Sequence, residues 1–240
     1  MRSRRLLPAF LLVFAAACSI RDAACGAPQQ GSQAPGEAPS AITGGAAPTT
    51  SPTAVKIAFL GDSLTAGQGL LSNQTFPEKI KGLFEADGFN EIEIVNGGIS
   101  GDTSAGGVRR VEQLLEPGVK ILVVALGAND ALRGMTVAQT RDNLRQIIDI
   151  AQMHDVQVML CGMEAPTNLG EDYRTAFKAL YFDVLRSYQR QIEYVPFLLE
   201  GVAGKPEMNQ TDGMHPNPAG SDVIAALLYP QLRKMVERIG

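Results

Sequence analysis

The sequence predicts an α/β protein in which helices cover both faces of a parallel sheet. Short apolar runs rich in β-branched residues recur along residues 55–240, and segments with helical periodicity separate them. Strands that alternate with helices in this way pair in parallel, and their crossovers place the helices against the sheet. The chain of 240 residues has room for one such domain and for an N-terminal extension.

Five runs have the composition of strands buried on both faces. Each is short and largely apolar, without the strict alternation of a strand that faces water on one side. The first run opens the domain, and the others follow at intervals long enough for a helix. The runs are VKIAFL (55–60), IEIVN (92–96), KILVVAL (120–126), VQVMLCG (156–162) and EYVPF (193–197).

Amphipathic helices are predicted in the intervals between these runs. Apolar residues recur three and four positions apart, which places them on one face of a helix that packs on the sheet. Thr136 and Gln139 have the spacing of a capping box, and Asn217 followed by Pro218 is typical of a helix start. The inward positions are Val108, Val111, Leu114 and Leu115; Leu144, Ile147, Ile148 and Ala151; Phe177, Leu180, Tyr181, Val184, Leu185 and Tyr188; and Ile224, Leu227 and Leu228.

The N-terminus has the organisation of a secretory signal. Three of residues 2–5 are arginines, and residues 6–17 form a short apolar stretch that ends in three alanines. Such a stretch is too short to span a bilayer, so residues 1–17 are interpreted as a signal peptide. The protein is therefore expected to be exported to a bacterial cell envelope.

Cys18 follows directly, at the place where a bacterial lipoprotein carries its lipidated cysteine. The pattern resembles a lipobox, although Ala15 stands where that motif usually has leucine, so ordinary release into the periplasm or medium is the alternative. Residues 18–54 are rich in Ala, Pro, Gly, Ser and Thr and are expected to form a disordered tether. Cys25 could pair with Cys18 if neither carries lipid, whereas Cys161 is expected as a small core residue.

The charge and residue clusters argue against several classes of partner. The formal net charge is −4 and no long basic run is present, which argues against a nucleic-acid partner. No cluster of histidine, cysteine and aspartate has the spacing of a zinc site, so neither a metal nor another cofactor is expected.

Polar and glycine-rich clusters follow the predicted strands. GDSL (61–64), NGGISGDT (96–103) and GAND (127–130) come directly after the first three strands. A fourth cluster, DGMHP (212–216), precedes the last helix. Ligands of a doubly wound sheet bind at the carboxyl ends of its strands, so the four clusters are expected to meet at one edge.

Ser63 is the candidate nucleophile, but a serine hydroxyl needs a base to take its proton. His215 is the candidate base, because Asp212 can hold the far imidazole nitrogen and leave the other nitrogen for the serine. Loop polarity and helix capping would also explain this pair without catalysis. His154, the second histidine, is expected at a solvated helix end.

Acyl transfer also needs hydrogen-bond donors for the developing oxyanion. The backbone amides of Ser63 and Gly101 and the side-chain amide of Asn129 are the candidate donors. Each also has an ordinary structural explanation, since glycine suits turns and asparagine caps helices. Their presence together, in order and after successive strands, favours the catalytic interpretation.

With the four clusters in order, the sequence resembles the SGNH hydrolases of the GDSL type. The segments ISGDTSAGG, LGANDALRG and DGMHPN are most similar to the branch of periplasmic arylesterases, thioesterases and lysophospholipases, apart from Ala128, where that branch often has glycine. The resemblance covers about residues 55–238 and implies a flavodoxin-like three-layer α/β/α sandwich without a metal. The residues that name the family correspond to Ser63, Gly101, Asn129 and His215, with Asp212 as the acid of the triad.

The resemblance implies a serine esterase that hydrolyses carboxylic esters or thioesters of small molecules or lipids through an acyl-enzyme. A carbohydrate O-acetyl esterase is the alternative enzyme, since the same residues can perform deacetylation. Two hypotheses involve binding without hydrolysis. One is a binding lipoprotein with a flavodoxin-like pocket, and the second is phosphate or flavin binding at the first glycine loop, which lacks a P-loop pattern. Leu70, Leu71, Met163 and Leu169 are expected either to line an acyl groove or to serve local packing.

Overall fold

The computed structural model describes residues 54–189 and 191–239. The predicted signal peptide, Cys18, Cys25 and all of the predicted tether except Ala54 lie outside these residues. Within them, no helix is long and apolar enough to cross a membrane.

Five parallel strands form a single sheet in the order β2-β1-β3-β4-β5, which confirms the predicted α/β fold with a doubly wound sheet. Gly61, the last residue of β1, pairs with Gly98 of β2 and Ala125 of β3. The loops that leave these three strands therefore begin side by side at one edge. The strands are β1 (Val55–Gly61), β2 (Ile92–Gly98), β3 (Val119–Ala125), β4 (Gln157–Cys161) and β5 (Glu193–Val195).

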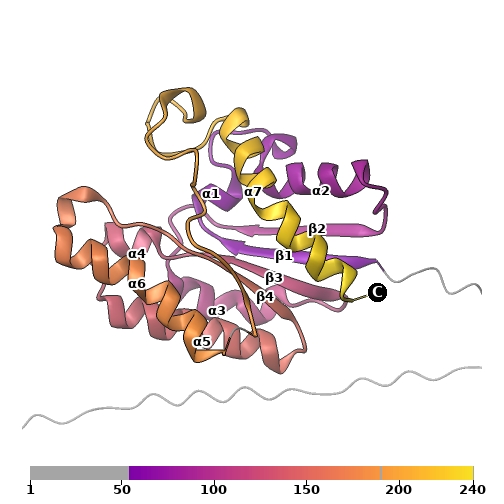
Figure 1. Cartoon of the computed structure of the whole chain (residues 1–240), viewed down its shortest axis with the longest axis horizontal. Helices are drawn as coiled ribbons and strands as arrows, with labels where there is room; N and C mark the ends of the chain where they lie inside the picture. The colour runs from indigo at the N-terminus through magenta and orange to yellow at the C-terminus, as the bar shows by residue number, and fades with distance from the viewer. Residues whose placement is uncertain (1–53, 190, 240) are drawn as a thin grey trace, which may run out of the picture. The chain divides into compact units, whose positions relative to one another are not determined.

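Helices cover both faces of the sheet and complete three layers (Figure 1). One face carries α2 (Phe76–Ala86) and α7 (Pro218–Glu237), and the other carries α3 (Ser104–Leu114), α5 (Val137–Met153) and α6 (Glu171–Ser187). Two short helices lie at the carboxyl edge, α1 (Ser63–Ala66) and α4 (Ala128–Leu132). Single 3₁₀ turns occur at η1 (Ser72–Gln74), η2 (Thr167–Leu169) and η3 (Pro206–Met208).

The predicted helix starts are confirmed at two positions. Thr136 and Gln139 form the capping box that opens α5, and Asn217 accepts the Gly220 amide at the start of α7. The sequence analysis did not predict α2, although Pro77 stands in its first turn and Ile80 is among its buried residues. The helices α1 and α4 are too short to show helical periodicity in the sequence.

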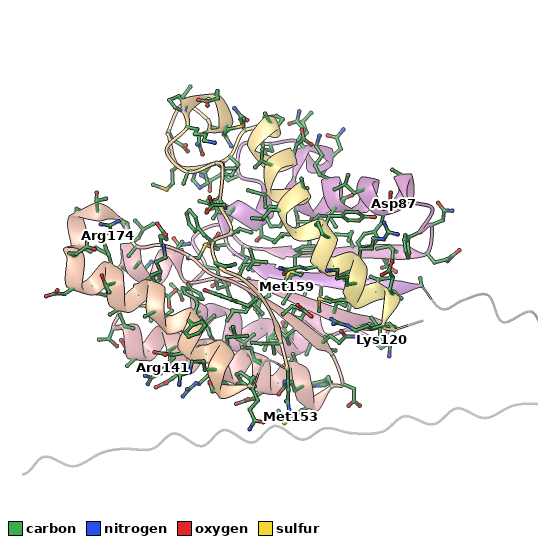
Figure 2. The ribbon with its side chains drawn as sticks, in the orientation of Figure 1. Asp87, Lys120, Arg141, Met153, Met159 and Arg174 are labelled. Atoms are coloured by element: carbon green, nitrogen blue, oxygen red, sulfur yellow. The ribbon has the colours of Figure 1, made fainter. Side chains whose placement is uncertain are left out.

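The hydrophobic core fills the space between the sheet and its two helical layers. Phe59 of β1 contacts Phe76 of α2 edge to face, with ring centroids 5.8 Å apart. Figure 2 contrasts Met159 of β4, whose side chain lies inside the molecule, with Met153 at the end of α5, which lies on its surface. Cys161 is buried as predicted, and burial raises the pKa of its thiol to about 12, so it stays protonated and unreactive.

Candidate active site

Ser63 lies at the turn where β1 ends and α1 begins. Asp62 is the N-cap of this short helix, and its carboxylate accepts the Leu64 amide at 3.0 Å. The turn is tight, because a Cβ placed on Gly61 would lie 2.0 Å from the Thr65 hydroxyl oxygen. This packing presents Ser63 at the carboxyl edge of the sheet, where a parallel α/β fold binds its ligands.

His215 joins Ser63 to Asp212 in a continuous chain of hydrogen bonds. The His215 Nε2 atom lies 2.9 Å from Ser63 Oγ, and His215 Nδ1 lies 2.6 Å from Asp212 Oδ2. The hydrogen bonds that Asp212 accepts from the His215 side chain and from the His215 and Met214 amides hold the pKa of this carboxyl well below its usual range. An ionised carboxylate only accepts, so Nδ1 carries the imidazole proton and Nε2 is left to accept the serine proton.

The loop that carries Asp212 and His215 is held by cross-loop hydrogen bonds. Asn209 and Pro216 form an isolated antiparallel bridge, and the Gln210 amide donates to the His215 carbonyl at 2.8 Å. The Gln210 side chain donates to the Pro216 carbonyl at 2.9 Å and to the Gln68 carbonyl at 2.7 Å. The second of these bonds ties the loop to the segment that follows Ser63.

Three hydrogen-bond donors lie beside Ser63. No hydrogen bond from the Ser63 or Gly101 amide is found within residues 54–189 and 191–239. The Asn129 side chain donates one N–H to Asp62 Oδ2 at 3.2 Å, and no bond of its second N–H is found within the described residues. Gly101 has φ +79°, a left-handed conformation that disfavours any residue with a Cβ. The structure thus brings the three predicted oxyanion donors to one cavity with His215.

Asp62 has a part in the site that the sequence analysis missed. Only 1% of this residue is exposed, and burial raises the pKa of its carboxyl to about 6, against the lowering effect of its bonds to the Leu64 amide and the Asn129 side chain. Its two oxygens contact the helix that begins at Ser63 and the candidate oxyanion donor Asn129. The contact with Asn129 spans 67 positions of the chain, so no local motif could reveal it.

A largely apolar cavity of about 310 Å³ opens beside Ser63. None of the four predicted groove residues lines it. Met163 is only 2% exposed and belongs to the core, Leu169 packs on the core, and Leu71 is 68% exposed. Leu70 is partly buried, outside the cavity wall. The apolar wall is formed by Leu64, Ala128, Leu132, Pro166, Leu199 and Met214.

Within the described part of the chain, no three His, Cys, Asp or Glu side chains are grouped so as to hold a metal ion. His154 caps the C-terminal end of α5, where its Nε2 lies 4.0 Å from Glu112. This is the solvated helix end expected from the sequence.

Comparison with known proteins identifies relatives over most of the described chain. The profile of the GDSL-like lipase/acylhydrolase family matches residues 59–223. Esterase TesA of Pseudomonas aeruginosa is 36% identical over 189 residues, which cover 78% of this chain and 92% of that protein. The thioesterase 1/protease 1/lysophospholipase L1 of Escherichia coli is 34% identical over 74% of this chain and 83% of its own length.

Solved structures of similar proteins have the same fold. The crystal structure of TesA superimposes with a TM-score of 0.70 at 36% identity, over 75% of this chain and 99% of that one. The psychrotrophic esterase EstA from a Pseudoalteromonas species gives a TM-score of 0.70 at 28% identity, over 76% of this chain and 98% of that one. The likeness therefore extends over nearly the whole length of these enzymes.

Proposed function

The chain belongs to the GDSL-like lipase/acylhydrolase family and is a carboxylic ester hydrolase, and on this premise we propose that Ser63, His215 and Asp212 are its catalytic triad. The observation that carries the proposal is the unbroken chain from Ser63 Oγ to His215 and on to Asp212, with separations of 2.9 and 2.6 Å. Ser63, at one end of this series of hydrogen bonds, lines a cavity large enough to admit an ester.

The geometry supports a two-step acyl-enzyme reaction. Ser63 Oγ attacks the ester carbonyl carbon while His215 Nε2 takes its proton, and the negative charge that develops on the carbonyl oxygen is met by the donors of Ser63, Gly101 and Asn129. The imidazolium then gives its proton to the departing alcohol or thiol. Water repeats the sequence on the acyl-enzyme and releases the carboxylic acid.

The apolar wall of the cavity supports an acyl chain as the group bound next to Ser63. An acetyl group would leave most of this wall in contact with water, whereas a longer chain would bury it and gain free energy from burial. This observation favours an esterase for longer acyl chains over the alternative carbohydrate O-acetyl esterase. The names of two relatives, an arylesterase of Vibrio mimicus that is 34% identical and the Escherichia coli thioesterase and lysophospholipase, extend the proposal to aryl esters, thioesters and lysophospholipids.

A matched pair of proteins tests the assignment of the nucleophile. Wild type and Ser63→Ala are compared on p-nitrophenyl and acyl-CoA esters of increasing chain length, with acetylated sugars alongside. We expect Ser63→Ala to lose turnover while it keeps the wild-type circular dichroism spectrum, and a serine-directed phosphonate to label Ser63 alone. Wild-type kcat in Ser63→Ala would overturn the proposal.

The location of the enzyme is a separate part of the proposal. Residues 1–17 act as the signal peptide and Cys18 carries the lipid, so the domain is held at a membrane of the cell envelope by a tether. The test is the mass of the mature N-terminal peptide, which should carry a diacylglyceryl group on Cys18. An unmodified N-terminus recovered from the soluble periplasm would mean that the enzyme is exported and free.

A further inference from the structure

Arg110 on α3 connects the two loops that present the backbone donors of the candidate oxyanion hole. Its Nη2 donates to the Gly61 carbonyl at 2.8 Å, and its Nη1 donates to the Gly97 carbonyl at 2.5 Å. Its Nε donates to Asp102 Oδ2 at 2.7 Å. One planar side chain thus contacts the ends of both β1 and β2 and the loop beyond β2.

The partners of Arg110 stand next to the donors in the sequence. Gly61 lies two residues before Ser63, and Asp102 follows Gly101 directly. The direction of each amide N–H depends on the peptide plane to which it belongs. The contacts of Arg110 fix the backbone just before Ser63 and just after Gly101. Arg110 therefore links the backbone beside Ser63 to the backbone beside Gly101. The amides of these two residues must both point at the oxyanion of the substrate.

We propose that Arg110, held by Asp102, is a positioning residue that sets the separation and direction of the Ser63 and Gly101 amides. The inference rests on the proposed function, because it concerns the oxyanion hole of that reaction. The side chains of Arg110 and Asp102 are only 17% and 12% exposed, so water offers little replacement for their bonds. Three donors in one rigid plane suit this task, and lysine cannot reproduce them from a single ammonium group.

The Gly101 loop makes few other hydrogen bonds to elements outside it, which gives Arg110 its importance as an anchor. Within the loop, Asp102 Oδ1 also accepts the Thr103 amide at 3.0 Å. The Ile99 amide donates to the Gly61 carbonyl, the Asp102 amide donates to the Ile99 carbonyl, and Arg133 donates to the Gly101 carbonyl at 2.7 Å. Arg133 is exposed, which weakens its hold on the loop. Oxyanion donors accelerate a reaction only if they already point at the oxygen before its charge develops. A displaced Gly101 loop should therefore reduce kcat rather than substrate binding.

The test compares Arg110→Met and Arg110→Lys with Arg109→Met, a matched control at the neighbouring exposed position of the same helix. We expect Arg110→Met to lower kcat by roughly 10–100-fold with KM changed less than about threefold, since misplaced donors lose transition-state stabilisation. Arg110→Lys should recover little of this loss, and Arg109→Met should behave as wild type.

A second readout separates positioning from a general loss of structure. A boronic acid forms a tetrahedral adduct on the serine whose oxygen occupies the oxyanion hole, so its Kd should rise in parallel with the fall in kcat, while binding of the alcohol product, which does not reach the oxyanion hole, stays unchanged. If Arg110→Met does not fold, Asp102→Asn is measured in its place. A wild-type kcat, or a rise in KM alone, would overturn the inference. Activity in Ser63→Ala would instead overturn the proposed function itself.

Discussion

Two aspartates of the candidate site have contrasting surroundings, since Asp62 is buried next to Ser63 and Asp212 is exposed behind His215. Asp62 sits in the tight turn between β1 and α1, where burial raises its pKa to about 6. Asp212 sits on an exposed loop before α7, where hydrogen bonds from His215 and two amides lower its pKa. Exposure alone therefore does not set the charge of a carboxyl. Hydrogen-bond donors keep the exposed Asp212 ionised. Asp62 has too few donors to cancel the rise in pKa that its burial causes.

The two regions are also held in place by different forces. The turn at Ser63 continues directly from a strand whose neighbours pair with it on both sides, so the sheet itself fixes its position. The loop at His215 projects beyond the sheet between β5 and α7 (Figure 1) and depends on the bonds of Gln210 and Asn209. The candidate nucleophile is therefore placed by the sheet, and the candidate base is placed by backbone and side-chain hydrogen bonds within one loop.

The largest expected effect comes from breaking the exposed region at the base. His215→Ala should lower kcat by roughly 10⁴–10⁶, because nucleophile and base act as a unit. Asp212→Ala should leave more residual activity, since this carboxylate orients the imidazole and does not itself take the proton. Steady-state kinetics of both variants, and of the double variant that combines His215→Ala with Ser63→Ala, would measure these losses. The double variant should be no less active than Ser63→Ala, and lower activity in Asp212→Ala than in His215→Ala would contradict the assignment.

A smaller but still large effect is expected on the buried side of the site. Asn129→Ala should lower kcat by roughly 10²–10³ with little change in KM, which is the typical loss for one preorganised donor. The measurement is the separation of kcat from KM on a single activated ester. A large rise in KM at constant kcat would show that Asn129 binds the substrate in its ground state, and the third oxyanion donor would then have to be another group.

The same comparison shows which features the sequence could reveal. The strands were predictable because their apolar runs are continuous, and the contact between Asp212 and His215 was predictable because their spacing allows it within one short loop. The cavity wall was not predictable. Leu132 is the last residue of α4 and Leu199 lies between β5 and η3, and what brings them together is the packing of the whole chain. Arg110 was missed for a related reason, since two of its three partners are backbone carbonyls, which leave no mark on the sequence.

The two aspartates should change stability with pH in opposite directions. The raised pKa of Asp62 means that the folded state binds its proton more tightly than the unfolded state, so its contribution to wild-type stability falls as pH rises from about 4 to above 6. The free energy of unfolding of Asp62→Asn, relative to wild type, should rise over this window by on the order of 3 kcal/mol. Urea unfolding at a series of pH values measures the difference.

Asp212→Asn provides the matched comparison on the exposed side. The lowered pKa of Asp212 gives stability that is present above about pH 4 and is lost as pH falls toward the folded-state value. The deficit of Asp212→Asn relative to wild type should therefore shrink as the solution is acidified below about pH 4. Parallel pH profiles for the two variants would show that the two carboxyls do not differ in the way their surroundings indicate.

The smallest expected effect tests the bond that joins the two regions. Gln210→Met keeps the length of the side chain but removes the donors to the Gln68 and Pro216 carbonyls. Each such bond contributes about 1 kcal/mol, and the backbone bridge between Asn209 and Pro216 remains, so kcat should fall by no more than about tenfold. Thr211→Val, at the neighbouring exposed position, is the control and should match wild type. Gln210→Glu should lose more activity than Gln210→Met, because a carboxylate facing two carbonyl oxygens repels both of them and pushes the His215 loop away from Ser63. Equal activity in all four proteins would mean that the loop keeps His215 in place without its tie to the nucleophile segment.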